Sequence, residues 1–359
     1  MRIGRTTRVF TDIGRDNPFK NDGSKRRFMI SIYYPSYDSD ISEHEPVYPE
    51  LFHPGEETAI EFLNNFGADV AYLNKLKTNV YYNAGILEGG VYPVIIYSPA
   101  FGIERDMYWF NIKNLVIQGF VVLTIGATYD SVFTVFPDGE YVQQLKTLAD
   151  LEGTDFEGWL TLLEIRIQDI RYVLDKLPEL NEIDELLKNK VNLQRIGLIG
   201  HSLGGAAVYR VLKENSLIKA GILLDPSLHL LGSSTSPLST PVLLMRQNST
   251  TYEMLINDGW NETVARETIK GQSHLASVLT GYKSFIKIHG ANHVTFSDAP
   301  IHFNETAIDI KHDVINEVIA SFLDEFVYDR AGEYTNKIGE ISGISLIGSD
   351  ESSLSSLRE

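Results

Sequence analysis

The chain has 359 residues, of which 43% are hydrophobic and 11% aromatic, a composition that supports a large buried core and excludes a disordered protein. Its 48 acidic and 31 basic residues give a formal net charge of −17, which opposes binding to nucleic acid and to anionic bilayers. Because the sequence has no cysteine, disulfides, thiolate metal sites and a cysteine nucleophile are excluded.

The N-terminal residues are basic but lead into no apolar stretch, so no secretory signal is recognised. No apolar run approaches the roughly 18 residues that a membrane-spanning helix needs. We therefore expect a cytoplasmic protein without stable membrane insertion. Secretion is the alternative if a signal preceded this segment, and interfacial contact and oligomeric state are left open.

Two strands are predicted in the N-terminal region, at residues 6–12 and 28–34, from their apolar and β-branched residues. Residues 37–84 are irregular and rich in proline, with one amphipathic helix predicted at 57–66. We interpret 37–84 as an insertion before the third strand that forms a wall or a lid of the binding pocket.

Beyond residue 93, short apolar strands alternate with helices. Strands are predicted at 94–97, 120–125, 196–199, 221–224, 241–245 and 284–288, and helices at 107–118, 159–177, 203–213 and 308–326. This alternation indicates a mostly parallel sheet with helices on both faces. We expect one domain over residues 1–338 and a flexible tail, rich in serine and glycine, over 339–359.

A Gly-x-Ser-x-Gly motif occurs at residues 200–204, between a predicted strand and a predicted helix. A serine on such a tight turn has a strained backbone and needs small residues two positions away on either side, which Gly200 and Gly204 supply. The turn exposes the hydroxyl of Ser202 and directs the amide of Leu203 to where an oxyanion would form. Ser202 is therefore the candidate nucleophile; the alternative is a glycine-rich turn needed only for packing.

A serine nucleophile needs a base and an orienting carboxylate, which in this arrangement follow it in the order acid, histidine. The candidate acid is Asp225, at the end of the predicted strand 221–224, with helix N-capping as its alternative role. After the next strand no carboxylate occurs before Glu253. Among nine histidines the candidate base is His293, in a loop after the last strand, whereas His289 is expected to be buried at the strand end.

The second oxyanion donor is expected in the loop after the strand at 94–97. Pro99 has no N–H, so the Phe101 amide is the first choice and the Ala100 amide the alternative. The sequence has no H-E-x-x-H motif or carboxylate cluster, and neither a metal nor a cofactor is expected.

With these motifs the chain resembles the type-II platelet-activating factor acetylhydrolases (calcium-independent phospholipases A2) and their bacterial relatives. The resemblance extends from about residue 5 to about residue 326. It rests on the serine motif with its following Gly205-Ala206 and on Asp16-Asn17-Pro18-Phe19, Gly119-Phe120-Val121-Val122, Phe136-Pro137-Asp138-Gly139 and Leu224-Asp225-Pro226. The chain departs from the family at Pro99-Ala100, where relatives commonly have His-Gly.

The resemblance implies an α/β-hydrolase fold, a Ser202-Asp225-His293 triad, and an oxyanion hole formed by the Leu203 and Phe101 amides. The implied activity is that of a serine carboxylic-ester hydrolase that forms an acyl-enzyme, acting on short-chain acyl esters or phospholipids similar to platelet-activating factor. Two alternatives are a general carboxylesterase or polyester hydrolase without lipid preference, and a non-catalytic binding protein of the same fold. The expected partner is a small ester or phospholipid, and not nucleic acid.

Overall fold

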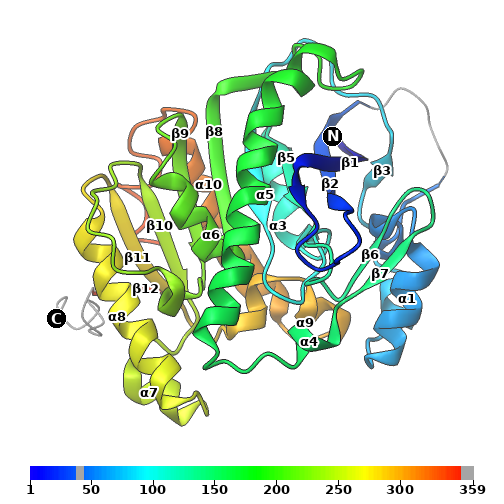
Figure 1. Cartoon of the computed structure of the whole chain (residues 1–359). Helices are drawn as coiled ribbons and strands as arrows, with labels where there is room; N and C mark the ends of the chain where they lie inside the picture. The colour runs from blue at the N-terminus through cyan, green and yellow to red at the C-terminus, as the bar shows by residue number, and fades with distance from the viewer. Residues whose placement is uncertain (38–43, 349–359) are drawn as a thin grey trace.

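The computed structural model describes residues 1–37 and 44–348 (Figure 1). The strands are β1 (Arg2–Asp16), β2 (Lys25–Ser36), β3 (Val80–Tyr82), β4 (Tyr92–Ser98), β5 (Val121–Ile125), β6 (Phe133–Val135), β7 (Tyr141–Gln143), β8 (Val191–His201), β9 (Ile218–Leu224), β10 (Val242–Arg246), β11 (Lys283–Ile288) and β12 (Ile344–Leu346). The helices are α1 (Glu56–Asn65), α2 (Val70–Leu73), α3 (Trp109–Ile117), α4 (Lys146–Ala149), α5 (Phe156–Ile183), α6 (Leu203–Leu212), α7 (Tyr252–Asn257), α8 (Glu262–Val278), α9 (Ala299–His302) and α10 (Ile308–Phe326).

One ten-stranded sheet organises the described residues, in the order β12-β11-β10-β9-β8-β4-β5-β2-β1-β3. Strands β11 to β5 in this order are all parallel, whereas β2 and β12 pair antiparallel with β5 and β11 at either end of that parallel block. Helices cover both faces, so the chain has the α/β-hydrolase fold that the sequence predicted. Among the described residues, no helix combines the length and apolar character needed to cross a membrane.

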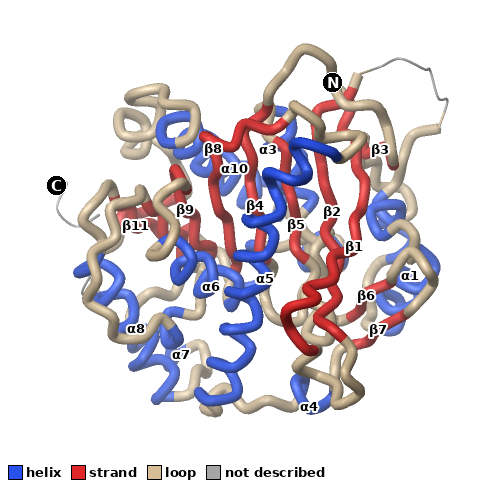
Figure 2. The backbone as a smooth tube through the Cα atoms, turned by 45° about the horizontal axis from the view of Figure 1, so that its top comes forward, coloured by secondary structure: helices blue, strands red, loops and turns tan. Residues whose placement is uncertain are grey.

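The parallel strands are buried on both faces. In β4, Val94 and Ile96 belong to the apolar layer that also contains residues of α5 and α6, while Ile95 and Tyr97 belong to the layer of α3 and α10. Figure 2 shows α5 and α6 in front of the sheet, with α3 and α10 behind it. Burial on both faces explains why these strands are continuous apolar runs rather than alternating ones.

The parallel strands end together at one edge of the sheet. The register pairs Ser98 of β4 with Gly200 of β8, and Gly200 with Leu223 of β9. In turn, Leu224 of β9 pairs with Met245 of β10. The segments that follow β4, β8, β9, β10 and β11 therefore lie side by side at the carboxyl edge.

Helix α5 is longer than the sequence predicted. It continues through Pro178 to Ile183, so the prediction of a helix that stops before Pro178 is wrong. Proline removes one N–H donor from the helix but does not remove the apolar contacts of its neighbours. Leu180, beyond the proline, is buried in the same layer as Leu177, and this tertiary packing stabilises the last turns.

The described part of the predicted insertion, residues 44–84, is anchored to the core. The hydroxyl of Tyr48 donates to Asp298 Oδ2 at 2.8 Å, and Leu51 is buried. The predicted helix at 57–66 corresponds to α1, in which Phe62 packs against Phe133 of the β6–β7 hairpin with ring centroids 5.5 Å apart. Residues 38–43 of this insertion lie outside the described residues.

Residues 339–348 do not form the flexible tail that was predicted. β12 pairs with β11, with Leu346 opposite Ile286, and the side chain of Ile347 is only 5% exposed. This edge strand is stabilised by pairing with a distant segment, so a local serine- and glycine-rich composition did not predict it. The domain boundary expected at residue 338 thus falls before a strand of the same sheet, and residues 349–359 lie outside the described part.

A chain that ends at residue 342 is expected to lose about 2 kcal/mol of unfolding free energy, because Ile347 leaves the core and β11 loses its edge partner. Guanidinium unfolding followed by circular dichroism measures this loss. A chain that ends at residue 348 retains β12 and is the matched control. Equal stability of the two shortened chains would contradict the packing of β12.

Candidate active site

Ser202 occupies a strained turn between β8 and α6. Its φ of 54° and ψ of −119° are unfavourable for a residue with a Cβ. Backbone hydrogen bonds hold the turn: the N–H of Ser202 donates to the Leu224 carbonyl at 3.0 Å, and the N–H of Ser227 donates to the Ser202 carbonyl at 2.9 Å. The serine side chain is therefore presented at the carboxyl edge, partly exposed.

The two glycines of the motif are required by close backbone contacts. A Cβ on Gly200 would lie 2.3 Å from the carbonyl oxygen of Gly204, and a Cβ on Gly204 would lie 2.3 Å from the carbonyl oxygen of Ser98. Both contacting atoms belong to the backbone, so no flexible side chain can move aside. The turn can close only if these positions carry no side chain.

A hydrogen bond joins the candidate base to the candidate acid. Nδ1 of His293 lies 2.6 Å from Oδ2 of Asp225. The other oxygen, Oδ1, accepts from Arg246 Nε at 2.8 Å and from the N–H of Gln247 at 3.3 Å. The carboxylate is thus bonded to groups at the end of β10 and after β11, rather than to the amides of a following helix as in an N-cap.

The environment of Asp225 favours its ionised form. Burial alone would raise the pKa of this carboxyl, but the hydrogen bond to His293 and the charge of Arg246 outweigh burial and hold the pKa below its ordinary value. The side chain of Asp225 is 3% exposed and that of His293 is 40% exposed. The pair therefore combines a buried anion with an imidazole that is accessible from the cavity.

Ser202, Asp225 and His293 line one cavity of about 380 Å³ at the carboxyl edge. Its walls are rich in aromatic side chains, with Trp159 packed edge-to-face on Phe101 at a centroid distance of 4.9 Å. The remaining lining residues are Gly153, Pro226, Ser227, His229, Arg246, Trp260, Val264 and Thr268. The cavity thus joins a nucleophilic and basic centre to a largely apolar binding space.

None of the described residues 44–84 lines this cavity. For these described residues the expected pocket wall is therefore corrected: α5, the segment after β9 and α8 supply walls of the cavity instead. His289 also lies elsewhere: it is exposed rather than buried as expected, with Nε2 2.7 Å from Ser345 Oγ of β12.

The loop after β4 distinguishes the two candidate oxyanion donors. The N–H of Ala100 donates to the Tyr108 hydroxyl at 2.8 Å and is therefore engaged. Within the described residues, the amide N–H groups of Phe101 and of Leu203 have no acceptor; Leu203 begins α6, where backbone N–H groups are free. This geometry favours Phe101 and Leu203 over Ala100.

Two side chains connect the loop after β4 to His293. The hydroxyl of Tyr108 lies 3.1 Å from His201 Nδ1, and His201 Nε2 lies 3.0 Å from the carbonyl oxygen of His293. Burial, together with the nearby His293, lowers the pKa of His201 to about 3, so its ring is neutral. Because a carbonyl only accepts, we assign the ring proton to Nε2, and Tyr108 then donates to Nδ1.

Sequence reasoning missed several residues of this site. Tyr108 lies within the helix predicted at 107–118, and that prediction gave its hydroxyl no role, although a buried tyrosine hydroxyl needs a partner. No role was predicted for Asp130, which forms a buried ion pair with Arg166 at 2.7 Å. Arg166 also donates to the Ala100 carbonyl at 3.3 Å. No sequence pattern singles out Arg246, because a triad calls for a carboxylate and not for an arginine at the end of this strand.

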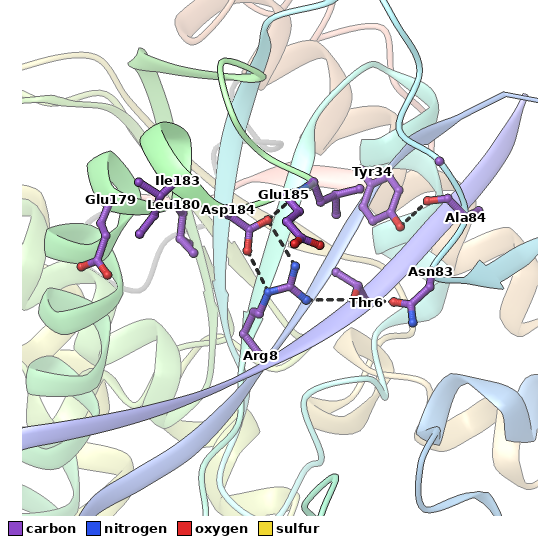
Figure 3. Close-up of a pocket in the computed structure, with 12 residues that line it drawn as sticks. Thr6, Arg8, Tyr34, Asn83, Ala84, Glu179, Leu180, Ile183, Asp184 and Glu185 are labelled. Carbon is purple, nitrogen blue, oxygen red and sulfur yellow. Dashed lines mark hydrogen bonds and ion pairs between the residues drawn. The ribbon is translucent and has the colours of Figure 1, made fainter.

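A larger hollow, of about 760 Å³, is lined by residues of β1, β2, the segment after β3, and α5 with the segment that follows it (Figure 3). In it Arg8 Nε donates to Asp184 Oδ2 at 2.8 Å, and the Tyr34 hydroxyl donates to the Ala84 carbonyl at 2.6 Å. These bonds tie the segment after α5 to β1, and β2 to the segment after β3. The nucleophilic and basic groups lie in the smaller cavity, which is therefore the candidate active site.

Comparison with known proteins agrees with the motifs. The sequence profile of the family described as platelet-activating factor acetylhydrolase, isoform II, matches residues 13–147 and 164–311. The chain belongs to this family. The matched segments contain Phe101, Ser202, Leu203, Asp225 and His293.

The individual relatives have low sequence identity to this chain. The platelet-activating factor acetylhydrolase of Cavia porcellus is 27% identical over 229 residues, covering 55% of this chain and 50% of that protein. The Gallus gallus protein of the same name is 22% identical over 316 residues, covering 80% and 72%. A probable 1-alkyl-2-acetylglycerophosphocholine esterase of Arthroderma benhamiae is 24% identical, covering 58% and 49%. The chain thus spans about half the length of several curated relatives that it matches.

A solved structure shares the fold over nearly the whole chain. The ferulic acid esterase from Streptomyces cinnamoneus superposes with a TM-score of 0.76, covering 97% of this chain and 96% of that one. The two sequences are 22% identical, so the similarity shows the α/β-hydrolase fold alone.

The substitution Gly204→Ala is expected to lower the unfolding free energy by about 2–3 kcal/mol, because the new Cβ would clash with the backbone of Ser98. Thermal or guanidinium unfolding measures the loss. Gly153→Ala is the matched control, since its Cβ would lie 3.9 Å from a Val264 methyl, an ordinary contact. If Gly204→Ala were as stable as Gly153→Ala, the described turn geometry would be wrong.

Proposed function

We propose that this chain is a serine carboxylic-ester hydrolase with Ser202 as nucleophile, His293 as base and Asp225 as the orienting acid. The observation that carries the proposal is the 2.6 Å hydrogen bond between His293 and the buried Asp225, in the same cavity as the strained Ser202. Family membership supports an ester as the substrate, as do relatives named acetylhydrolase and esterase.

The proposed reaction transfers an acyl group in two steps. Oγ of Ser202 attacks the ester carbonyl carbon while Nε2 of His293 accepts the hydroxyl proton, and the amides of Leu203 and Phe101 stabilise the oxyanion. His293 then protonates the leaving alcohol oxygen, so the acyl group stays on Ser202. A water molecule, deprotonated by His293, hydrolyses this acyl-enzyme, and the proton returns to Ser202. Throughout, Asp225 keeps Nε2 of His293 facing the reacting atoms.

We further propose short-chain acyl esters as the substrate class, including phospholipids with a short sn-2 acyl group. The cavity volume of about 380 Å³ is near the lower end for ligand sites, which favours a small acyl group. Trp159, Trp260 and Phe101 would contact an apolar chain of limited length. Relatives named platelet-activating factor acetylhydrolase support an acetyl ester in particular.

Ser202→Ala is expected to lower kcat for p-nitrophenyl acetate by about 10⁴–10⁶-fold, because the acyl-enzyme can no longer form. The same substitution should abolish labelling by a fluorophosphonate probe. Ser321→Ala, on α10 and hydrogen-bonded to the Val318 carbonyl, is the matched control and should retain both properties. Hydrolysis that survives in a pure, folded Ser202→Ala protein would overturn the assignment.

For p-nitrophenyl esters of graded length, we expect kcat/KM to be highest from acetate to butyrate and to fall at least about tenfold by decanoate, because the cavity is small. Trp260→Ala, which removes an aromatic wall, should raise the decanoate-to-acetate ratio. A diacyl phosphatidylcholine with short chains, tested below and above its micellar concentration, measures lipid preference. A wild-type preference for decanoate would contradict the proposed substrate class.

A further inference from the structure

Arg246 makes a direct contact at the candidate active site: a permanent cation is bonded to the carboxylate of Asp225, the proposed orienting acid. Its side chain is 1% exposed, and its Nε donates to Asp225 Oδ1 at 2.8 Å. The second oxygen of the same carboxylate receives His293 Nδ1 at 2.6 Å. Asp225 therefore lies between a guanidinium and an imidazole.

The guanidinium is held in place from a second side. Arg246 Nη1 donates to Gln272 Oε1 of α8 at 2.7 Å, and Gln272 Nε2 donates to the Gly348 carbonyl at 3.0 Å. These bonds make Arg246 part of an ordered connection from Asp225 through α8 to the segment after β12. An arginine fixed in this way cannot withdraw its charge from the carboxylate without breaking both contacts.

Among the described residues, two charged and two neutral titratable side chains are placed near the His293 ring by their contacts and interactions. Asp225 faces it from β9 and Arg246 lies behind that carboxylate on β10. His201, from the end of β8, and His229, from the segment after β9, are both neutral because burial lowers their pKa values to about 3 and about 4. Asp225 and Arg246 are therefore two opposed charges that this geometry places on the Nδ1 side of the His293 ring.

We propose that Arg246 is a positioning residue that aligns Asp225 and, through its charge, sets the protonation equilibrium of His293. This inference rests on the proposed function of the Ser202 site. A carboxylate stabilises a protonated imidazole, and a guanidinium on its other side partly cancels that effect. Arg246 thereby keeps His293 unprotonated, and able to act as a base, at lower pH than Asp225 alone would permit.

The test compares the pH dependence of kcat/KM for p-nitrophenyl acetate in three variants. The acidic limb of this profile is the pH range in which kcat/KM rises as the base loses its proton. Arg246→Gln should move the midpoint of this limb upward by about one pH unit, because the charge that opposes Asp225 is lost. Arg246→Lys keeps the charge and should hold the limb within about 0.3 unit. Arg166→Gln, in an equally buried pair with Asp130, is the matched control and should leave the limb in place even if the plateau rate falls.

A second readout does not depend on activity. The measurement is an NMR titration of protein labelled with ¹³C-histidine, in which the His293 signal is assigned by its loss in His293→Gln. This signal should titrate at higher pH in Arg246→Gln than in the wild-type chain. If the chain hydrolyses no ester, the proposed function fails, and this titration still decides whether Arg246 acts on His293.

The inference would be overturned if folded Arg246→Gln kept the wild-type midpoints of both the acidic limb and the His293 titration. It would also be overturned if Arg246→Lys shifted these midpoints as much as Arg246→Gln does. If Arg246→Gln does not fold, Gln272→Glu replaces it, since a carboxylate beside Arg246 Nη1 offsets the same charge. An upward shift of about half a unit in that variant supports the inference, and no shift overturns it.

Discussion

The common end of five neighbouring parallel strands is the constraint on which the site depends. Each strand brings one group to the carboxyl edge: the Phe101 amide after β4, Ser202 after β8, Asp225 after β9, Arg246 at the end of β10 and His293 after β11. The strands are buried on both faces, so their ends are where polar groups can meet substrate. Groups up to about 190 positions apart in the chain become neighbours because hydrogen-bonded ladders align the strand ends.

Two hydrogen-bond systems act on His293 from different directions. Asp225 holds the ring through Nδ1, while His201 bonds the backbone carbonyl of the same residue. The second system continues through Tyr108 to the amide of Ala100, so the proposed base and the loop after β4 share one support. His293 can thus remain 40% exposed toward the cavity and still have a defined position. Such preorganisation favours acyl transfer, because dipoles that are already fixed in place stabilise the charge that develops in the transition state.

The predictions that failed all depended on contacts between distant segments. Composition suggested a flexible end from residue 339, but pairing with β11 makes residues 344–346 a strand. Pro178 suggested a helix end, but burial of Leu180 carries α5 further. The insertion at 37–84 was expected to wall the pocket, whereas the described part is anchored through Tyr48 and other residues form the cavity. In each case tertiary packing outweighed a local preference.

By itself, the sequence determined the fold class and the position of the serine turn, because apolar periodicity and the spacing of Gly200 and Gly204 are local properties of the chain. It also nominated Asp225 and His293 from their places after strands. Only the tertiary structure decided that Ala100 is engaged by Tyr108, that tryptophans of α5 and of the segment before α8 wall the cavity, and that Arg246 shares the carboxylate of Asp225. These contacts join segments far apart in the chain, so their geometry is set by how strands and helices pack, which no local pattern encodes.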